Sequence, residues 1–208
     1  MNIVQDQARK LRELVRHVDG TRVSERRSPA VVTIVGGCPQ VGVTSIVTRL
    51  AAELARQSTR TAIQPGDKSL DDTSTGADIV LIDGGAGCSQ EAASRWSNLD
   101  LVLLVVTGAR EALLKTYETL KVATLANRNL PIYLVPNQCL DASEAESIHQ
   151  RISVSCERFL GFAVPAATWM PMLHFESQPE DSNPNLVKLA RFVIEHTLIE
   201  VPVRTHAA

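Results

Sequence analysis

Residues 30–57 read AVVTIVGGCPQVGVTSIVTRLAAELARQ, and this stretch decides the fold. Residues 30–35 are apolar apart from Thr33, as expected of a strand that is covered on both faces. A glycine-rich loop follows, and from residue 44 to residue 57 the apolar side chains recur with helical spacing. The order strand, glycine-rich loop, helix predicts an anion-binding turn, because the loop amides and the helix dipole both attract negative charge.

The glycine-rich loop keeps most of the phosphate-binding template GxxxxGK[ST]. Gly37, Gly42 and Thr44 stand at the positions of the template, whereas Val43 stands in place of its lysine. The hydroxyl of Thr44, followed by Ser45, can still meet Mg²⁺, but the mobile cation that reaches the β and γ phosphates is missing. We therefore predict a loop that attracts an anion and lacks much of the charge stabilisation that hydrolysis requires.

The rest of the chain alternates short apolar runs with longer helical segments. Strands are predicted at residues 30–35, 61–64, 79–82, 101–106 and 132–135, with a further candidate at 162–164. Helices are predicted at residues 44–57, 110–126, about 143–159 and about 186–196. This alternation predicts an α/β domain over residues 30–200, with a mostly parallel central sheet and helices on both faces.

A second loop, Asp83-Gly84-Gly85-Ala86-Gly87, follows the apolar run 79–82. Ligands of such sheets bind at the carboxyl ends of the strands, and an aspartate there, beside a phosphate loop, is used to hold hydrated Mg²⁺. We predict that Thr44 and Asp83 form a Mg²⁺ site and that the glycines let the backbone approach a phosphate. A glycine-rich turn capped by its aspartate is the alternative.

The composition excludes several classes of protein. The chain has 208 residues, 44% of them hydrophobic, and 21 Lys+Arg against 23 Asp+Glu give a formal net charge of −2. This length supports one sizeable core, and the balanced charge gives no global basic field, so no nucleic-acid partner is predicted. No apolar run is long enough to cross a bilayer and the N-terminus has no apolar signal core, so we expect a cytoplasmic protein with reduced cysteines.

Residues 1–20 differ in character from the α/β domain. Apolar side chains fall on one face of a predicted helix there: Val4, Ala8, Leu11, Val15 and Val18. Residues 21–29 are polar, without apolar periodicity, and are predicted to be a flexible linker, and residues 201–208 form a tail. The first helix is thus expected to be tethered to the domain rather than built into its core.

The glycine-rich loop resembles the deviant Walker A motif, KGGxGK[ST][ST], of the MinD/ParA ATPases. On that resemblance Cys38 stands at the signature lysine and Val43 at the second lysine, so the motif is degenerate. The resemblance also implies that Asp83 and Gly87 belong to switch II, and that Asn137 reads the adenine of an ATP or ADP bound with Mg²⁺. The segment DGGAG is similar to the DTGAG of the flagellar branch of this family, FlhG, also called YlxH or FleN.

The start of the chain resembles the same branch. Residues 6–12, DQARKLR, reproduce the DQAxxLR motif of FlhG proteins. In that family this helix docks on the SRP-type GTPase FlhF and stimulates GTP hydrolysis, with the glutamine reaching the active site of the partner. The resemblance implies that these residues bind and activate an FlhF-like GTPase: Asp6, Gln7, Ala8, Leu11 and Arg12. An ordinary amphipathic helix, packed on its own domain or on an anionic membrane surface, is the alternative.

Three functions stay open on these observations. The first is an FlhG-like regulator of flagellar number or placement, with an SRP-type GTPase and flagellar basal-body proteins as partners and a domain that no longer hydrolyses ATP. The second is a slow ATP-hydrolysing switch in which a cation from elsewhere, such as Arg110, replaces the lost lysines. The third is a protein-binding scaffold that uses no nucleotide.

Two segments depart from the pattern of the family. Residues 65–77 are a short polar stretch where the family has a longer region that includes switch I, and Asp67 alone corresponds to its DxD element. Residues 198–208 are short and contain Pro202, instead of forming a basic amphipathic helix. Membrane association is therefore expected to be weak or indirect, through a partner at the membrane or the cell pole.

Overall fold

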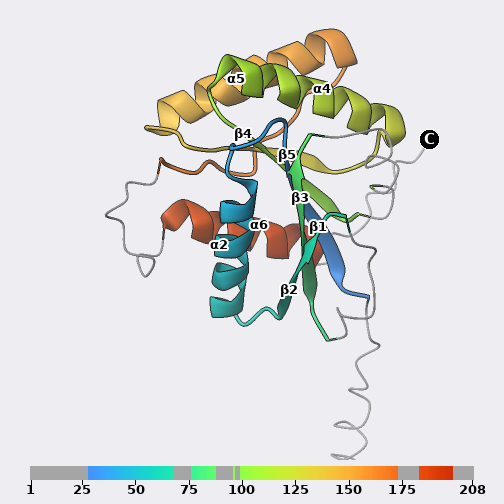
Figure 1. The fold of residues 1–208 in the computed structure, drawn as a ribbon, viewed down its shortest axis with the longest axis vertical. Helices are drawn as coiled ribbons and strands as arrows, with labels where there is room; N and C mark the ends of the chain where they lie inside the picture. The colour runs from blue at the N-terminus through green and yellow to red at the C-terminus, as the bar shows by residue number, and fades with distance from the viewer. Residues whose placement is uncertain (1–27, 68–75, 88–95, 97–98, 173–182, 199–208) are drawn as a thin grey trace, which may run out of the picture.

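A single parallel sheet is the centre of the molecule (Figure 1). The computed structural model describes residues 28–67, 76–87, 96, 99–172 and 183–198. In chain order the strands are β1 (Ala30–Gly36), β2 (Thr61–Pro65), β3 (Ile79–Ala86), β4 (Leu101–Val106) and β5 (Ile132–Pro136). They lie in the order β2-β3-β1-β4-β5, and every neighbouring pair is parallel, which confirms the predicted sheet.

Helices cover both faces of this sheet (Figure 1). On one face lie α2 (Val43–Arg56) and α6 (Pro184–Thr197), and on the other lie α4 (Arg110–Ala126) and α5 (Ala142–Leu160). The start of α5 is fixed by Asp141, whose side chain accepts the backbone N–H of Glu144 at 2.8 Å. None of the helices in the described part of the chain has the length and hydropathy that a membrane crossing requires.

The core is divided by the sheet into two layers. β1 and β4 are buried at every position, as their consecutive apolar residues predict. One layer joins the sheet to α2 and α6 around Leu50 and Leu189, and the other joins it to α4 and α5 around Leu120 and Ile152. Each fully buried leucine contributes about 1.5–3 kcal/mol relative to an exposed one, so these layers fix the sheet edge that carries the loops.

The structure departs most from the prediction at the candidate strand 162–164 and at the end of β3, whereas the other bounds agree to within one or two residues. The candidate strand at 162–164 does not form: α5 ends at Leu160 with Gly161 as its C-cap, and the chain then makes a single parallel bridge from Ala166 to Leu134. Pro165 has no N–H to donate, so a longer ladder cannot develop there. β3 does not stop at residue 82 but continues to Ala86, because its pairing with β1 persists through a register shift. Residues 1–20 and 201–208, and the linker up to residue 27, lie outside the described residues.

Candidate functional site

The loop between β1 and α2 turns sharply into the first turn of the helix. Gly42, the residue before α2, has a left-handed backbone with φ of 96°, which a side chain disfavours. A Cβ at this position would also lie 2.4 Å from Nδ2 of Asn137. Backbone conformation and close packing therefore both require the glycine that the template places there.

The two residues predicted to hold Mg²⁺ are in contact. The hydroxyl of Thr44 donates to Oδ2 of Asp83 at 2.8 Å, and Oδ1 of the same carboxylate accepts the N–H of Gly85 at 3.1 Å. A hydroxyl and a carboxylate are oxygen ligands that suit Mg²⁺, which keeps several waters and usually takes phosphate oxygens as well. The described residues contain no group of three or more His, Cys, Asp or Glu that could hold a metal by itself. This pair therefore suits a cation that arrives with a phosphate.

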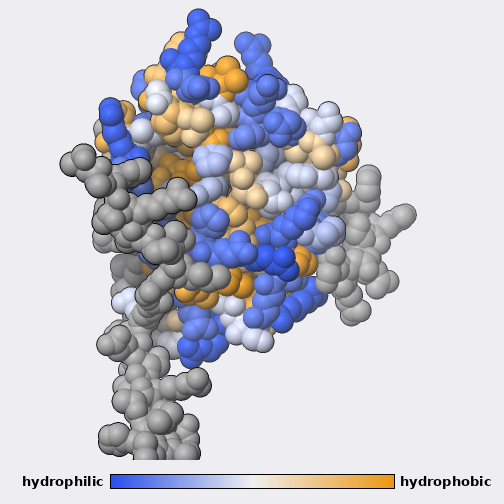
Figure 2. Space-filling view, turned by 180° about the vertical axis from the view of Figure 1, so that it is seen from behind, coloured by the Kyte–Doolittle hydropathy of each residue, from blue (hydrophilic) through white to orange (hydrophobic). Residues whose placement is uncertain are grey.

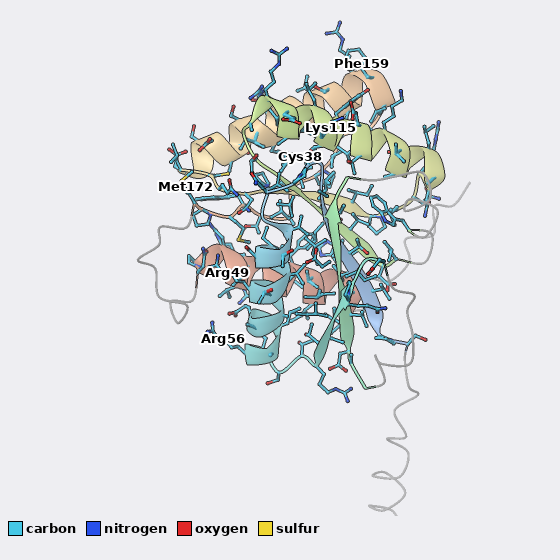
Figure 3. The ribbon with its side chains drawn as sticks, viewed as in Figure 1. Cys38, Arg49, Arg56, Lys115, Phe159 and Met172 are labelled. Carbon is cyan, nitrogen blue, oxygen red and sulfur yellow. The ribbon has the colours of Figure 1, made fainter. Side chains whose placement is uncertain are left out.

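No cation stands where the template has its lysine. Val43 is only 6% exposed and belongs to the core layer under α2. Cys38 is half-buried, lies below α4 in the view of Figure 3, and packs against the same layer. Burial and then the carboxylate of Glu111 raise the pKa of the Cys38 thiol. Both positions therefore present neutral groups to a bound anion.

Two side chains that follow β5 hold the loop in place. Nδ2 of Asn137 donates to the carbonyl of Val41 at 2.7 Å, and Nε2 of Gln138 donates to the carbonyl of Gln40 at 3.1 Å. The backbone N–H of Asn137 is itself held by the carbonyl of Val106 at 2.8 Å. The amide predicted to read adenine thus also fastens the phosphate loop, a contact that the sequence did not predict.

A small cavity of about 200 Å³ adjoins the loop. Gly42, Ser45 and Asn137 line one side of it, and Arg49 and Met170 also contribute. Pockets for drug-sized ligands are typically about 300–1,000 Å³, so this cavity has room for one end of a nucleotide.

Helix α4 packs against the loop at Gly37. A Cβ at Gly37 would lie 2.4 Å from the backbone nitrogen of Thr116, so only glycine fits. The side chain of Thr116 is fully buried, and its hydroxyl has no hydrogen-bond partner in the described part of the chain. Our sequence analysis did not identify Thr116. The helical spacing could have indicated that this residue is buried, because Thr116 stands between Ala112 and Leu120 on the buried face of α4.

The described residues of the predicted nucleotide site gather at one edge of the sheet. They are Gly37, Cys38, Gly42, Val43, Thr44, Ser45, Asp83, Gly87 and Asn137, contributed by β1, α2, β3 and the turn after β5. Gly87 closes the group, since its N–H donates to the carbonyl of Gly36 at 2.7 Å. Arg110 is not part of this group and lines a groove between α4 and α5.

The residues of the DQAxxLR motif lie outside the described residues: Asp6, Gln7, Ala8, Leu11 and Arg12. Cys139 follows β5 and is buried, and this burial raises the pKa of its thiol to about 11, the opposite of what a reactive thiolate requires.

Neither a protein-family model nor a curated protein sequence matches this chain. Solved structures do match it. MinD of Pyrococcus horikoshii, complexed with Mg-ADP, has a TM-score of 0.57 and 14% identity, and the match covers 80% of this chain and 96% of that one. MinD of Aquifex aeolicus has a TM-score of 0.59 and 13% identity, with 83% and 99% covered. A ParA family ATPase of Chlorobium tepidum has a TM-score of 0.54 and 12% identity, with 81% and 91% covered. The chain therefore has an α/β fold of the MinD/ParA type.

Proposed function

We propose that this protein is an FlhG-like regulator whose α/β body no longer hydrolyses ATP and positions an activating N-terminal segment on an SRP-type GTPase. It would thereby act on flagellar number or placement. The observation that carries the loss of hydrolysis is the burial of Val43 in the core at the position where the phosphate-binding template has its lysine. The body keeps the shape of a phosphate loop without its cation.

The loss of hydrolysis follows from the charges around the loop. Phosphoryl transfer depends on groups that neutralise charge on the transferred phosphate, and one such cation, an arginine finger, typically contributes a factor of about 10³–10⁵ to turnover. Among the described cations near this edge, Lys115 is paired with Glu118 at 2.8 Å, and Arg110 lines a different groove. Arg49 of α2 lines the cavity beside the loop. None of these three residues stands at the position of a missing lysine.

Binding of Mg²⁺ with a nucleotide remains compatible with the same site. Thr44 and Asp83 would hold the cation, and the cation would offset phosphate charge that the loop no longer neutralises. The solved MinD of Pyrococcus horikoshii is complexed with Mg-ADP. We assign ATP or ADP with Mg²⁺ to this chain as a ligand that stabilises the body and is not turned over.

The activating role rests on the DQAxxLR segment, in which Gln7 would orient the attacking water of the partner GTPase. The test measures GTP turnover by the cognate FlhF-like GTPase alone, with the full chain, and with a chain that lacks residues 1–20. We expect the full chain to stimulate GTP turnover and the chain without residues 1–20 not to stimulate it. Gln7→Ala should abolish the stimulation, and Gln5→Ala, a neighbouring glutamine outside the motif, should retain it. Equal stimulation by both variants would overturn the mechanism.

A slow ATP switch is the second candidate, favoured by the retained contact between Thr44 and Asp83. This function requires that the protein hydrolyses ATP and that the Asp83→Asn substitution abolishes the release of phosphate.

The scaffold interpretation requires that nucleotide has no effect on the protein. A ligand at 100 times its dissociation constant stabilises a protein by about 2.7 kcal/mol, so a melting temperature unchanged by millimolar Mg-ATP would support this interpretation. Neither of these two functions predicts stimulation of the partner GTPase, whereas the proposed function does.

A further inference from the structure

A groove of about 640 Å³ lies between α4 and α5. Its apolar lining includes Leu114 and Tyr117 of α4 with Val154 and Phe159 of α5. Three of these side chains are open to solvent, with exposed fractions of 56% for Leu114, 55% for Val154 and 67% for Phe159. Figure 2 shows hydrophobic surface between hydrophilic side chains at this end of the molecule. Large apolar side chains that cluster at the surface mark contact sites.

The aromatic side of the groove is held in a defined arrangement. The rings of Tyr117 and Phe159 meet edge to face, with centroids 6.5 Å apart and an interplanar angle of 79°. The guanidinium of Arg158 lies 5.2 Å from the centroid of the Phe159 ring. Phe159 therefore contacts Tyr117 and Arg158 although most of its surface is exposed.

The charged side chains that line the groove have one sign. Arg110 and Arg151 are among its lining residues, and the lining contains no carboxylate. The glutamates of α4 and α5 are not among the lining residues: Glu111, Glu118, Glu144, Glu146 and Glu157. Neither arginine forms an ion pair with a carboxylate of the residues that the structure describes. An apolar floor with unpaired guanidinium groups beside it is complementary to an apolar and acidic ligand.

We propose that the groove binds an amphipathic helix of another protein, with apolar side chains between α4 and α5 and carboxylates facing Arg110 and Arg151. Helices that lie in grooves place apolar anchors at i, i+3, i+4 and i+7, a spacing that suits a floor formed by two helices. This inference uses neither the phosphate loop nor residues 1–20, so it stands independently of the proposed function.

The charge argues against two other occupants. The predicted N-terminal helix of this chain has no acidic excess, because Arg9, Lys10, Arg12 and Arg16 outnumber its three carboxylates, Asp6, Glu13 and Asp19. A second copy placed by a two-fold axis would bring identical patches together and set guanidinium groups against each other. An acidic helix avoids both conflicts.

The test uses the full chain and a fluorescent peptide of about 18 residues, with leucine and phenylalanine at helical spacing and glutamate beside them. A matched peptide carries lysine in place of each glutamate. Fluorescence anisotropy should show saturable binding of the acidic peptide and at least about tenfold weaker binding of the basic one. The Arg151→Glu substitution should lower the affinity for the acidic peptide by about tenfold, and Phe159→Ser should lower it by a similar factor. Leu125→Ser, which is 73% exposed on α4 outside the groove, serves as the control and should bind as the unaltered chain does.

Several results would overturn the proposal. One is equal binding of the two peptides, and another is equal loss of binding in the Leu125→Ser control. Tighter binding of a peptide spanning residues 1–20 would assign the groove to the N-terminus of this chain. Concentration-dependent dimerisation that Phe159→Ser abolishes would assign it to a second copy. Melting temperatures of the variants identify any that fail to fold, and in that case Val154→Ser provides a second apolar substitution at an exposed site.

Discussion

The buried hydroxyl of Thr116 lies where α4 meets the phosphate loop and has no partner in the described part of the chain. A buried polar group without a hydrogen bond costs roughly 1–3 kcal/mol. Thr116→Val keeps the shape and removes that cost, so we expect the free energy of unfolding to rise by about 1 kcal/mol in urea titrations. Thr119→Val is the matched control, because the Thr119 hydroxyl does donate, to the carbonyl of Lys115 at 2.9 Å. Thr119→Val should lower the free energy of unfolding because it removes this hydrogen bond. If Thr116→Val lowers it by a similar amount, the Thr116 hydroxyl has a hydrogen-bond partner in solution.

The thiols of Cys139 and Cys156 should be chemically inert in the folded protein. Burial raises each pKa from 9.0 to about 11. Because the folded-state pKa is raised, their contribution to stability is fully present below about pH 9 and is lost as the pH rises toward about 11. We expect iodoacetamide at about pH 8 to modify Cys38 faster than either buried thiol, as mapped by mass spectrometry. Urea-unfolded chain is the control, in which the three sites should react alike. Rapid native modification of Cys139 would contradict its burial.

At the residue scale, sequence reasoning found the groups that a motif specifies. Gly42, Thr44 and Asp83 were identifiable because phosphate and Mg²⁺ chemistry demands those residue types at that spacing. The bond from Asn137 to Val41 and the orphaned hydroxyl of Thr116 were not identifiable, because each depends on a contact between segments far apart in the chain.

The loop between β1 and α2 is held as an element by the turn after β5. Asn137→Ala would leave the carbonyl of Val41, a residue only 2% exposed, without its side-chain donor. We expect a loss of about 1–3 kcal/mol in the free energy of unfolding, with faster hydrogen exchange at the start of α2. Gln138→Ala removes the exposed counterpart bond to Gln40 and should cost less, about 0.5–1.5 kcal/mol. The reverse ranking of the two variants would show that the loop is held by other contacts.

The elements themselves were largely predictable where one residue pattern dominates. The bounds of β4 and α4 match the predictions, 101–106 and 110–126, because a consecutive apolar run and a helical repeat are unambiguous there. The end of β3 was not predictable, since Asp83 to Ala86 are held by pairing with β1 and not by their own propensity. The strand expected at 162–164 failed because Gly161 and Pro165 limit pairing on both sides.

In the whole molecule, α4 contributes to two separate sites. One side of this helix packs against Gly37 through Thr116, and another side lines the groove through Leu114 and Tyr117. A ligand in the groove would contact α4 directly, and a ligand in the loop would bind to a segment that α4 packs against. Coupling between them requires that α4 has two arrangements, which differential binding of either ligand would bias.

The body and the N-terminal segment should be separable functions of one molecule. The double substitution Cys38→Lys, Val43→Lys restores both lysines of the family motif. Because Val43 is buried at the start of α2, where the helix dipole disfavours a cation, we expect the unliganded protein to lose about 2 kcal/mol or more. Millimolar Mg-ATP should then raise its melting temperature more than that of the unaltered chain, since the new cations meet the phosphates.

The same double variant should stimulate the FlhF-like GTPase as the unaltered chain does, whereas removal of residues 1–20 should abolish stimulation and leave the response to Mg-ATP unchanged. Adding Asp83→Asn to the double variant provides the control. This substitution removes a carboxylate that would hold Mg²⁺ together with Thr44, so it should cancel the additional rise in melting temperature caused by Mg-ATP. If the lysines change GTPase stimulation, or if the truncation changes the response to Mg-ATP, the body does more than position the N-terminal segment, and ATP binding is coupled to activation of the partner.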